Sequence, residues 1–530
     1  MGTALVAAKA SLRDNALSML WGLLLVSLSF LLHLNYLPYA EDDAYIHMRI
    51  ARHLWMTGYP YFNHGEPVMG STAPLWLLIT GPGAIAGDFQ PLAVACLNIF
   101  VLTSAAWIWG LVFARLIRSE AHMPHGGALV VTFLTLAPSS ISLMETPLAM
   151  MLTGLGYLGA LNRQWWSIPA IALVPFVRPE CAVFAIAIFV YRLYSKQTWS
   201  LLEVAATALP VSLLIAFDLH FFGTVIPHTA RAKDIVYEIS THEFVRFFCF
   251  GSYGAAIARG ILPFSLSAAG ITLITLILSF KREQSGSIFH EPLRAIPPIT
   301  FVLAPAGVIL LLYAVKHVLV FPWYTPLILV PAHLGCLYLV HYRTLSVKLL
   351  GASLLLPLCC VGLLLSGGLQ NPEVSPFFES GARARQLRLL GTALYRAFPG
   401  ARLMAPEIGA LGFSFRGRII DSIGLISPQA LEYHPLQIPR QRPAGFLGSV
   451  PRDLVVNERP ELIVGLSTLV TDLSEPDPIE DYDIIKRSPM SAEDLARGDN
   501  GTVFGAREIL IFRRKDLMSP EGRDILTTVN

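Results

Sequence analysis

The chain reads YAEDDAYIHMRIARHLWMTGYPYFNHGEPVMGSTAPLW from Tyr39 to Trp76. This stretch begins with three consecutive carboxylates, Glu41, Asp42 and Asp43, directly after an apolar run that is long enough to cross a bilayer. Because charged side chains are unfavourable inside lipid, these carboxylates must lie at the end of a membrane helix, at the water boundary. This stretch therefore marks the surface of a membrane, and the segments that follow are assigned relative to it.

The composition is that of a polytopic membrane protein. Of the 530 residues, 54% are hydrophobic and only 14% are charged, which excludes an ordinary soluble globular protein. The 6 cysteines show no paired spacing and mostly lie in apolar runs, so we expect neither a disulfide framework nor a zinc site. The formal net charge of +2 hides a segregation of basic and acidic residues into different loops.

Apolar runs predict about eleven transmembrane helices. They are Ala16–Leu34, Leu92–Ala114, Ala128–Ser140, Pro147–Leu161, Ile168–Val177, Cys181–Tyr194, Leu201–Phe221, Ile261–Phe280, Ile296–Tyr313, Leu319–Val340 and Leu349–Leu365. Lys9 and Arg13 precede the first span and favour a cytoplasmic N-terminus, and the long apolar core favours a retained anchor over a cleaved signal peptide. Pro74–Gly87 is apolar but short, and it is interpreted as an interfacial or re-entrant helix in the first outer loop.

The basic loop residues support this count. When the sides alternate, the following residues all lie on the side of the N-terminus: Arg115, Arg118, Arg163, Arg192, Lys196, Lys281, Arg282, Arg343 and Lys348. The carboxylates of the other loops, including Glu145 and Glu180, then lie outside the cytoplasm. The assignment requires that residues 168–194 form two segments divided at Arg178-Pro179-Glu180, since one long helix would reverse every later segment.

The composition changes near Asn371, where arginines, acids, prolines and glycines become frequent. We therefore divide the chain into a transmembrane domain, 1–370, with an outer loop at 35–91, and a soluble domain, 371–530. Periodicity predicts a helix over Ala382–Ala397, a loop over Pro435–Pro451, and strands over Arg402–Ala405, Arg418–Asp421, Glu461–Val464 and Ile509–Phe512. A small extracytoplasmic α/β domain is the expected result.

The stretch quoted first predicts an amphipathic helix from about Glu41 that lies along the membrane. Its polar face consists of Asp42, Tyr45, Arg49 and Arg52, and its apolar face of Ala44, Met48, Ala51 and Trp55. Asp42 and Asp43 occupy the first turn, where the helix dipole favours negative charge. The pair is therefore consistent both with simple helix capping and with a functional site.

Several short motifs, taken in order, resemble the GT-C fold glycosyltransferases. They are Asp42-Asp43-Ala44-Tyr45-Ile46, Arg49-Ile50-Ala51-Arg52, Gly70-Ser71-Thr72, Met144-Glu145-Thr146-Pro147-Leu148, Arg178-Pro179-Glu180, Ile226-Pro227-His228-Thr229 and Glu407-Ile408-Gly409-Ala410-Leu411-Gly412. The resemblance is greatest to the branch that contains the mycobacterial terminal arabinofuranosyltransferase and the pilin arabinosyltransferase. The chain departs from the family pattern at Cys181, at His228 and near His47, which bears on substrate contacts more than on the reaction class.

The resemblance implies a transferase of the bacterial inner membrane. It would move a sugar, with arabinofuranose the first expectation, from a polyprenyl-phosphate donor to a hydroxyl of a glycan or protein acceptor of the cell envelope. The partners are then the lipid donor, the acceptor and membrane lipid, with no nucleic acid. The acidic groups permit a divalent cation, held through oxygen ligands, but do not require one.

Candidate site residues follow from that implied reaction. Asp42 or Asp43 would accept the proton of the acceptor hydroxyl, with Asp42 preferred because it leads the polar face of the helix. The expected partners of the donor phosphate and sugar are Arg178, His228, Arg231, Lys233, Lys316 and His317. Further substrate contacts are expected from Tyr45, Arg49, Glu145 and Glu180.

Other interpretations stay open at this point. A transporter or lipid-linked sugar flippase would require ionisable residues at mid-membrane and often repeated halves, and a non-catalytic scaffold would not require the acidic pair. Arg178 and Glu180 are also expected as a simple ion pair across a proline turn, and Glu145 as a helix cap. Trp323-Tyr324 is interpreted as an interfacial aromatic anchor rather than a stacking platform for substrate.

Overall fold

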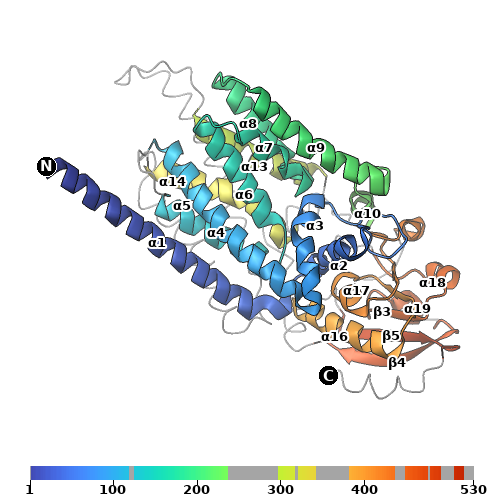
Figure 1. Ribbon diagram of the computed structural model, residues 1–530. Coiled ribbons are helices and arrows are strands. Elements are labelled where there is room, and N and C mark those ends of the chain that lie inside the picture. The colour runs from blue at the N-terminus through green and yellow to red at the C-terminus, as the bar shows by residue number, and fades with distance from the viewer. Residues whose placement is uncertain are drawn as a thin grey trace.

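The computed structural model describes residues 2–118, 124–236, 297–316, 320–341, 381–435, 448–474, 478–490 and 506–517. The predicted spans Ile261–Phe280 and Leu349–Leu365 lie outside the described residues, as do His317 and positions 436–447 of the predicted loop. A bundle of helices forms the larger part of the molecule, and a mixed domain of strands and helices lies at one end of it (Figure 1).

The bundle helices correspond to the other predicted spans. They are α1 (Gly2–Tyr36), α4 (Gln90–Leu116), α5 (Gly126–Ile141), α6 (Thr146–Leu161), α7 (Ser167–Ala172), α8 (Ala182–Tyr194), α9 (Leu201–Phe222), α13 (Pro298–Val315) and α14 (Pro326–His341). Within the described residues, four helical stretches are long and apolar enough to cross a membrane: Met19–Tyr39, Pro74–Leu116, Leu201–Phe222 and Pro298–Val315. The chain is a polytopic α-helical membrane protein.

The division of residues 168–194 into two segments is confirmed. Arg192, near the end of α8, donates a hydrogen bond of 2.8 Å to Ser167 Oγ at the start of α7, so the chain turns back on itself. Arg192 also forms an ion pair with Glu203, which closes a capping box with Ser200 at the start of α9. The Arg178-Pro179-Glu180 turn therefore lies at the opposite end of this hairpin, where Arg178 follows the 3₁₀ turn η3 (Val174–Phe176) and directly precedes the 3₁₀ turn η4 (Pro179–Cys181).

The first outer loop contains α2 (Asp42–Thr57), α3 (Pro74–Thr80) and η2 (Gly81–Phe89), which leads into α4. The predicted division of α2 into a polar and an apolar face is wrong, because residues 44–51 are all buried. The reason is that α2 lies between the helix bundle and the α/β domain and has neighbours on both sides (Figure 1). Asp42 and Asp43 of its first turn are partly exposed, and its last turn reaches the surface, where Trp55 is 48% exposed.

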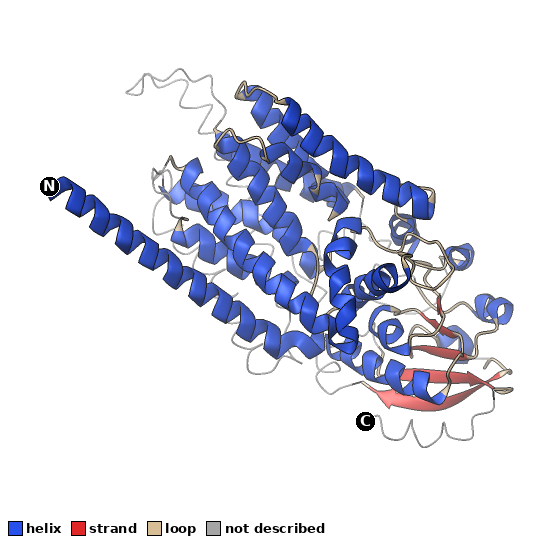
Figure 2. Cartoon of the chain, viewed as in Figure 1, coloured by secondary structure: helices blue, strands red, loops and turns tan. Residues whose placement is uncertain are grey.

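The C-terminal domain is a five-stranded mixed sheet with helices, which agrees with the predicted α/β class (Figure 2). Its elements are α16 (Gly381–Ala397), β1 (Leu403–Ala405), α17 (Gly409–Phe415), β2 (Ile419–Asp421), η7 (Pro428–Tyr433), α18 (Arg452–Glu458), β3 (Leu462–Leu466), α19 (Thr471–Ser474), β4 (Tyr482–Pro489) and β5 (Glu508–Arg514). The strand order is β2-β1-β3-β5-β4, with β1 parallel to β2 and β3, and β5 antiparallel to β3 and β4.

Arg49 holds the α/β domain against the first outer loop. Its guanidinium donates hydrogen bonds to the carbonyl oxygens of Phe62 at 2.8 Å, of Gly417 at 2.7 Å and of Gly412. Asn63 adds a second link, because its amide accepts from the Ile419 N–H at 3.0 Å and donates to the Ile419 carbonyl at 2.7 Å. The side chain of Asn63 thus takes the place of a neighbouring strand at the free edge of β2.

Arg49→Leu is expected to lower the free energy of unfolding by about 3 kcal/mol or more, because it leaves buried carbonyl groups without donors. The matched control is Arg418→Leu on the same interface, since Arg418 pairs with Glu66 at 2.6 Å where both side chains are partly exposed. The control should cost less than about 1 kcal/mol. Thermal unfolding of the detergent-solubilised proteins checks both, and equal losses in the two variants would contradict a special role of Arg49.

Candidate active site

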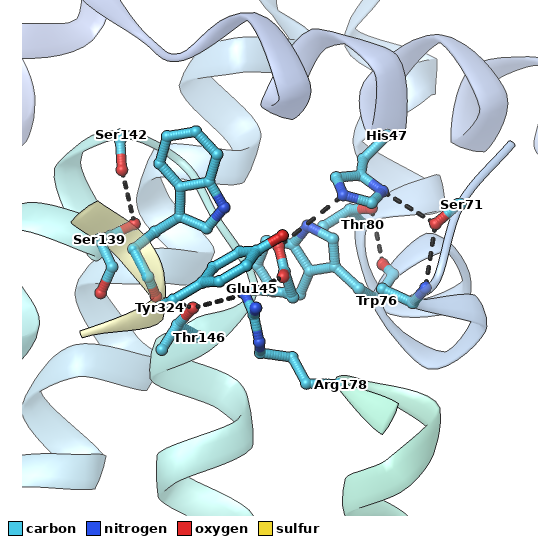
Figure 3. A network of polar contacts seen from close by, with 12 residues as sticks. His47, Ser71, Trp76, Thr80, Ser139, Ser142, Glu145, Thr146, Arg178 and Tyr324 are labelled. Atoms are coloured by element: carbon cyan, nitrogen blue, oxygen red, sulfur yellow. Dashed lines mark hydrogen bonds and ion pairs between the residues drawn. The ribbon is translucent and has the colours of Figure 1, made fainter. Parts of the chain in front are cut away.

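A buried network of charged side chains lies where the ends of several helices meet α2 (Figure 3). Arg178 Nη1 donates to Glu145 Oε1 at 2.7 Å, and Arg178 also binds Glu180 Oε1, from Nε at 2.9 Å and from Nη2 at 2.5 Å. The side chains of Arg178 and Glu145 are only 5% and 4% exposed. Burial alone would raise the pKa of Glu180, but Arg178 holds that pKa below its ordinary value.

The local backbone explains how these motifs meet. Glu145 immediately precedes α6, after the tight turn that ends α5, and Pro147 follows within the first turn of α6. Arg178 is extended, at φ −150° and ψ 117°, as expected for a residue that precedes proline. Both turns lie at the same end of the bundle, so two motifs that are 33 positions apart in sequence form one ion-pair network.

His47 joins this network from α2. Its Nε2 lies 3.8 Å from Glu145 Oε2, and its Nδ1 lies 2.9 Å from Ser71 Oγ (Figure 3). Ser71 Oγ accepts from the Ala73 N–H at 3.1 Å, so its hydroxyl proton can be donated to Nδ1, which leaves the ring proton on Nε2 facing Glu145. Burial lowers the pKa of His47 although Glu145 and Asp43 oppose this effect, so the ring is neutral near pH 7.

Aromatic side chains border the network. The Arg178 guanidinium lies 4.2 Å from the ring centre of Tyr324, which belongs to the 3₁₀ turn η5 (Pro322–Tyr324), and Tyr313 donates to Glu180 at 3.1 Å. Lys233, on α10 (His228–Val236), donates to the Tyr324 hydroxyl at 3.4 Å. Tyr324, which was expected to be an interfacial anchor, thus also places its ring in the charged network (Figure 3).

The two aspartates of the first loop have different environments. The Asp42 carboxylate accepts from the Gly409 N–H at 2.9 Å and from the Ala410 N–H at 2.8 Å, and so binds the start of α17. This contact requires glycine, since a Cβ at Gly409 would lie 1.9 Å from the Asp42 carbonyl oxygen. Asp43 is partly exposed, has no hydrogen-bond or ion-pair partner in the described ranges, and lies one helical turn before His47.

The other predicted site residues of the described chain lie outside the network. Tyr45 is fully buried against Phe413 at 5.3 Å between ring centres, and Arg49 is committed to carbonyl groups, so neither reaches the network. His228 contacts the Gly424 carbonyl oxygen at 3.0 Å and links α10 to the α/β domain. Arg231 is exposed on α10, and Lys316 is exposed three residues beyond Tyr313.

His47, Ser71 and Tyr324 were not predicted as site residues. The spacing of four between Asp43 and His47 was the available signal for the first, because it places both side chains on one side of a helix. The signal for Ser71 was the Gly70-Ser71-Thr72 motif, and that for Tyr324 was the aromatic pair Trp323-Tyr324, but neither pattern indicates contact with Arg178 or His47. Among the described residues there is no group of three or more His, Cys, Asp and Glu side chains arranged to hold a metal ion.

The fold and the network define a polytopic helical membrane protein with a buried ionisable site at one end of its bundle. The chain is 27% identical over 232 residues to a terminal β-(1→2)-arabinofuranosyltransferase of Corynebacterium glutamicum. This match covers 36% of the chain and 33% of the relative, and it confirms the resemblance that the motifs predict. The match thus extends over about a third of the relative's length.

A crystal structure of ArnT from Cupriavidus metallidurans in the apo state aligns with a TM-score of 0.47 and 12% sequence identity. This alignment covers 93% of the present chain and 97% of that chain. No family model matches the chain.

Asp42 should make the folded protein less stable as the pH rises. Burial, with smaller effects of Glu407 and Asp43, raises its pKa from 3.8 to about 7, so the folded state binds this proton more tightly than the unfolded state. The free energy of unfolding should therefore fall between about pH 4 and about pH 7, and Asp42→Asn should reduce this slope. Thermal unfolding across the pH range measures it; Asp88→Asn, an exposed carboxylate of the same loop, is the control. Equal slopes in the parent and Asp42→Asn would contradict the assignment.

Proposed function

We propose that the protein is a membrane glycosyltransferase that moves a sugar, with arabinofuranose the first candidate, from a polyprenyl-phosphate donor to a hydroxyl of a cell-envelope glycan or protein. The observation that carries the proposal is the position of Asp43, a partly exposed carboxylate, beside the His47–Glu145–Arg178 network at the end of the bundle. The similarity to an arabinofuranosyltransferase supports the class of sugar.

Asp43 is the proposed general base. An acceptor hydroxyl has a pKa far above 7 and needs a positioned carboxylate to take its proton as the new bond to the anomeric carbon forms. Asp42 was the first expectation, but each of its oxygens already accepts a backbone N–H of α17. Asp43 keeps its carboxylate available and has His47 one turn away. Asp42 would then act by positioning the start of α2 against the α/β domain.

Lys233 is the proposed contact of the donor phosphate. This phosphate becomes the leaving group and gains charge in the transition state, which a nearby cation stabilises. Lys233 lies at the border of the network, 3.4 Å from the Tyr324 hydroxyl and 5.7 Å from the ring centre of Phe321. Arg178 was expected in this role, but two carboxylates compensate its charge, so we assign it to the support of Glu145, Glu180 and Tyr324.

The proposed orientation places the network and the α/β domain outside the cytoplasm of a bacterial inner membrane, with about eleven spans and a cytoplasmic N-terminus. The arginines that follow α4 and α6, Arg118 and Arg163, and Arg192 of α8 are near the helix ends opposite the network, which supports this orientation. The lipid tail of the donor would then lie beside the bundle, with its phosphate at the level of α10.

Asp43→Asn should lower the rate of sugar transfer by about 10²–10⁴, because it removes the proton acceptor. Donor binding should change little, since the carboxylate acts mainly in the transition state. Single-turnover transfer by purified protein with a panel of polyprenyl-phosphate sugars measures the rate, and Asp88→Asn is the control. Transfer by Asp43→Asn at the parent rate would refute the base assignment. A parent that moves the lipid across the bilayer without transfer would favour the flippase.

Lys233→Gln should raise the KM for the lipid donor by about 10-fold to 100-fold, because a charged hydrogen bond to phosphate is lost. The KM for the acceptor should stay close to that of the parent. Arg231→Gln, an exposed cation on the same helix, is the matched control. If both variants weaken donor use equally, the phosphate is held by general positive charge rather than by Lys233.

A further inference from the structure

Asp218 is a carboxylate inside the apolar helix α9. It lies four residues before the C-terminal end of that helix at Phe222, which is roughly 6 Å along the helix axis. The residue is 3% exposed, and no group in the described part of the chain donates a hydrogen bond to its buried Oδ1. Ionisable residues in membrane helices are rare and mark functional positions, because a structural position would favour an apolar side chain.

Asp218 is one of the residues that line a small cavity. The volume of this cavity is ≈ 10 Å³, which is the room of one water molecule or one hydroxyl group. Most of its wall is apolar and consists of Ile50, Pro60, Met69, Pro74, Leu77, Phe217 and Phe222, and the remaining lining residues are Gly70 and Ser71. The hydroxyl of Ser71 contacts His47 and the Ala73 N–H instead, so Asp218 Oδ1 has no hydrogen-bond donor among the described residues, and its position is unfavourable unless a bound molecule supplies one.

Ser71 connects this cavity to the active-site network. Ser71 lines the cavity together with Asp218, and its Oγ lies 2.9 Å from His47 Nδ1. A group that enters the cavity is therefore separated from His47 by one side chain. The size of the cavity excludes a whole sugar ring and accepts a single polar substituent.

We propose that Asp218 is a substrate-binding residue that accepts a hydrogen bond from one sugar hydroxyl inserted into this cavity. The inference rests on the proposed function, since both the donor sugar and a glycan acceptor carry hydroxyl groups. The hydroxyl belongs to one of these two substrates, and separate kinetics for each identifies which. Asp218 then contributes to the choice of substrate, whereas Asp43 contributes to the chemistry.

The test compares Asp218→Asn and Asp218→Leu with Asp234→Asn, which changes an exposed carboxylate on the next described helix. Asp218→Leu should raise the KM for one substrate by about 10-fold to 100-fold, with a much smaller change in kcat. Its melting temperature should equal or exceed that of the parent, because an uncompensated buried carboxylate is removed. A deoxy substrate that lacks the bound hydroxyl should lose the same factor with the parent and nothing further with Asp218→Leu.

Unaltered KM values for donor and acceptor in both Asp218 variants of an active protein would overturn this inference alone. A lowered melting temperature with kcat reduced and both KM values unchanged would also overturn it, since that pattern belongs to a structural residue. A parent protein that transfers no sugar from any donor of the panel would overturn the proposed function and this inference together.

Discussion

Arg178 carries a positive charge that the interior can hold only if partners compensate it, and this requirement organises one end of the helix bundle. Its two carboxylate partners come from different turns, Glu145 before α6 and Glu180 before α8. The ring of Tyr324 covers its guanidinium and brings in the segment before α14. One buried cation thus joins three parts of the chain, and the neighbouring groups, His47 and Lys233, are positioned relative to it.

The second constraint is that α2 is shared between the bundle and the α/β domain. Asp42 binds the first amides of α17 and Arg49 binds the carbonyl oxygens of Gly412 and Gly417, so the α/β domain holds α2 at two positions along its length. Asp43 and His47 lie on another side of the helix and are left for the network. The α/β domain therefore contributes to the site indirectly, by fixing the orientation of the helix that carries the proposed base.

Much of the fold could be predicted from the sequence, because membrane helices are apolar over their whole length and basic residues mark one side. The turn at Arg178-Pro179-Glu180 was predictable from charges beside a proline. Of the predicted site residues, Glu145 and Arg178 form an ion pair, and Lys233 is linked to Arg178 only through Tyr324. The burial of α2 on all sides could not be predicted, because hydrophobic periodicity reveals a buried face only when the opposite face is exposed to solvent. Strand β4 was not predicted because its many exposed positions hide the alternation typical of a strand. The contact of Tyr324 with Arg178 was not predicted because it depends on tertiary packing alone.

Asn63 affects how the α/β domain would behave if it were separated from the rest of the chain. Its amide occupies the N–H and C=O of Ile419, which otherwise form an open sheet edge able to recruit a strand from another molecule. The opposite edge, β4, carries Lys486 and Arg487, charges that discourage such pairing. A fragment cut away from the first loop would lose its protection on the β2 side alone, so self-association should begin there. The first outer loop thus protects the α/β domain against aggregation through its β2 edge.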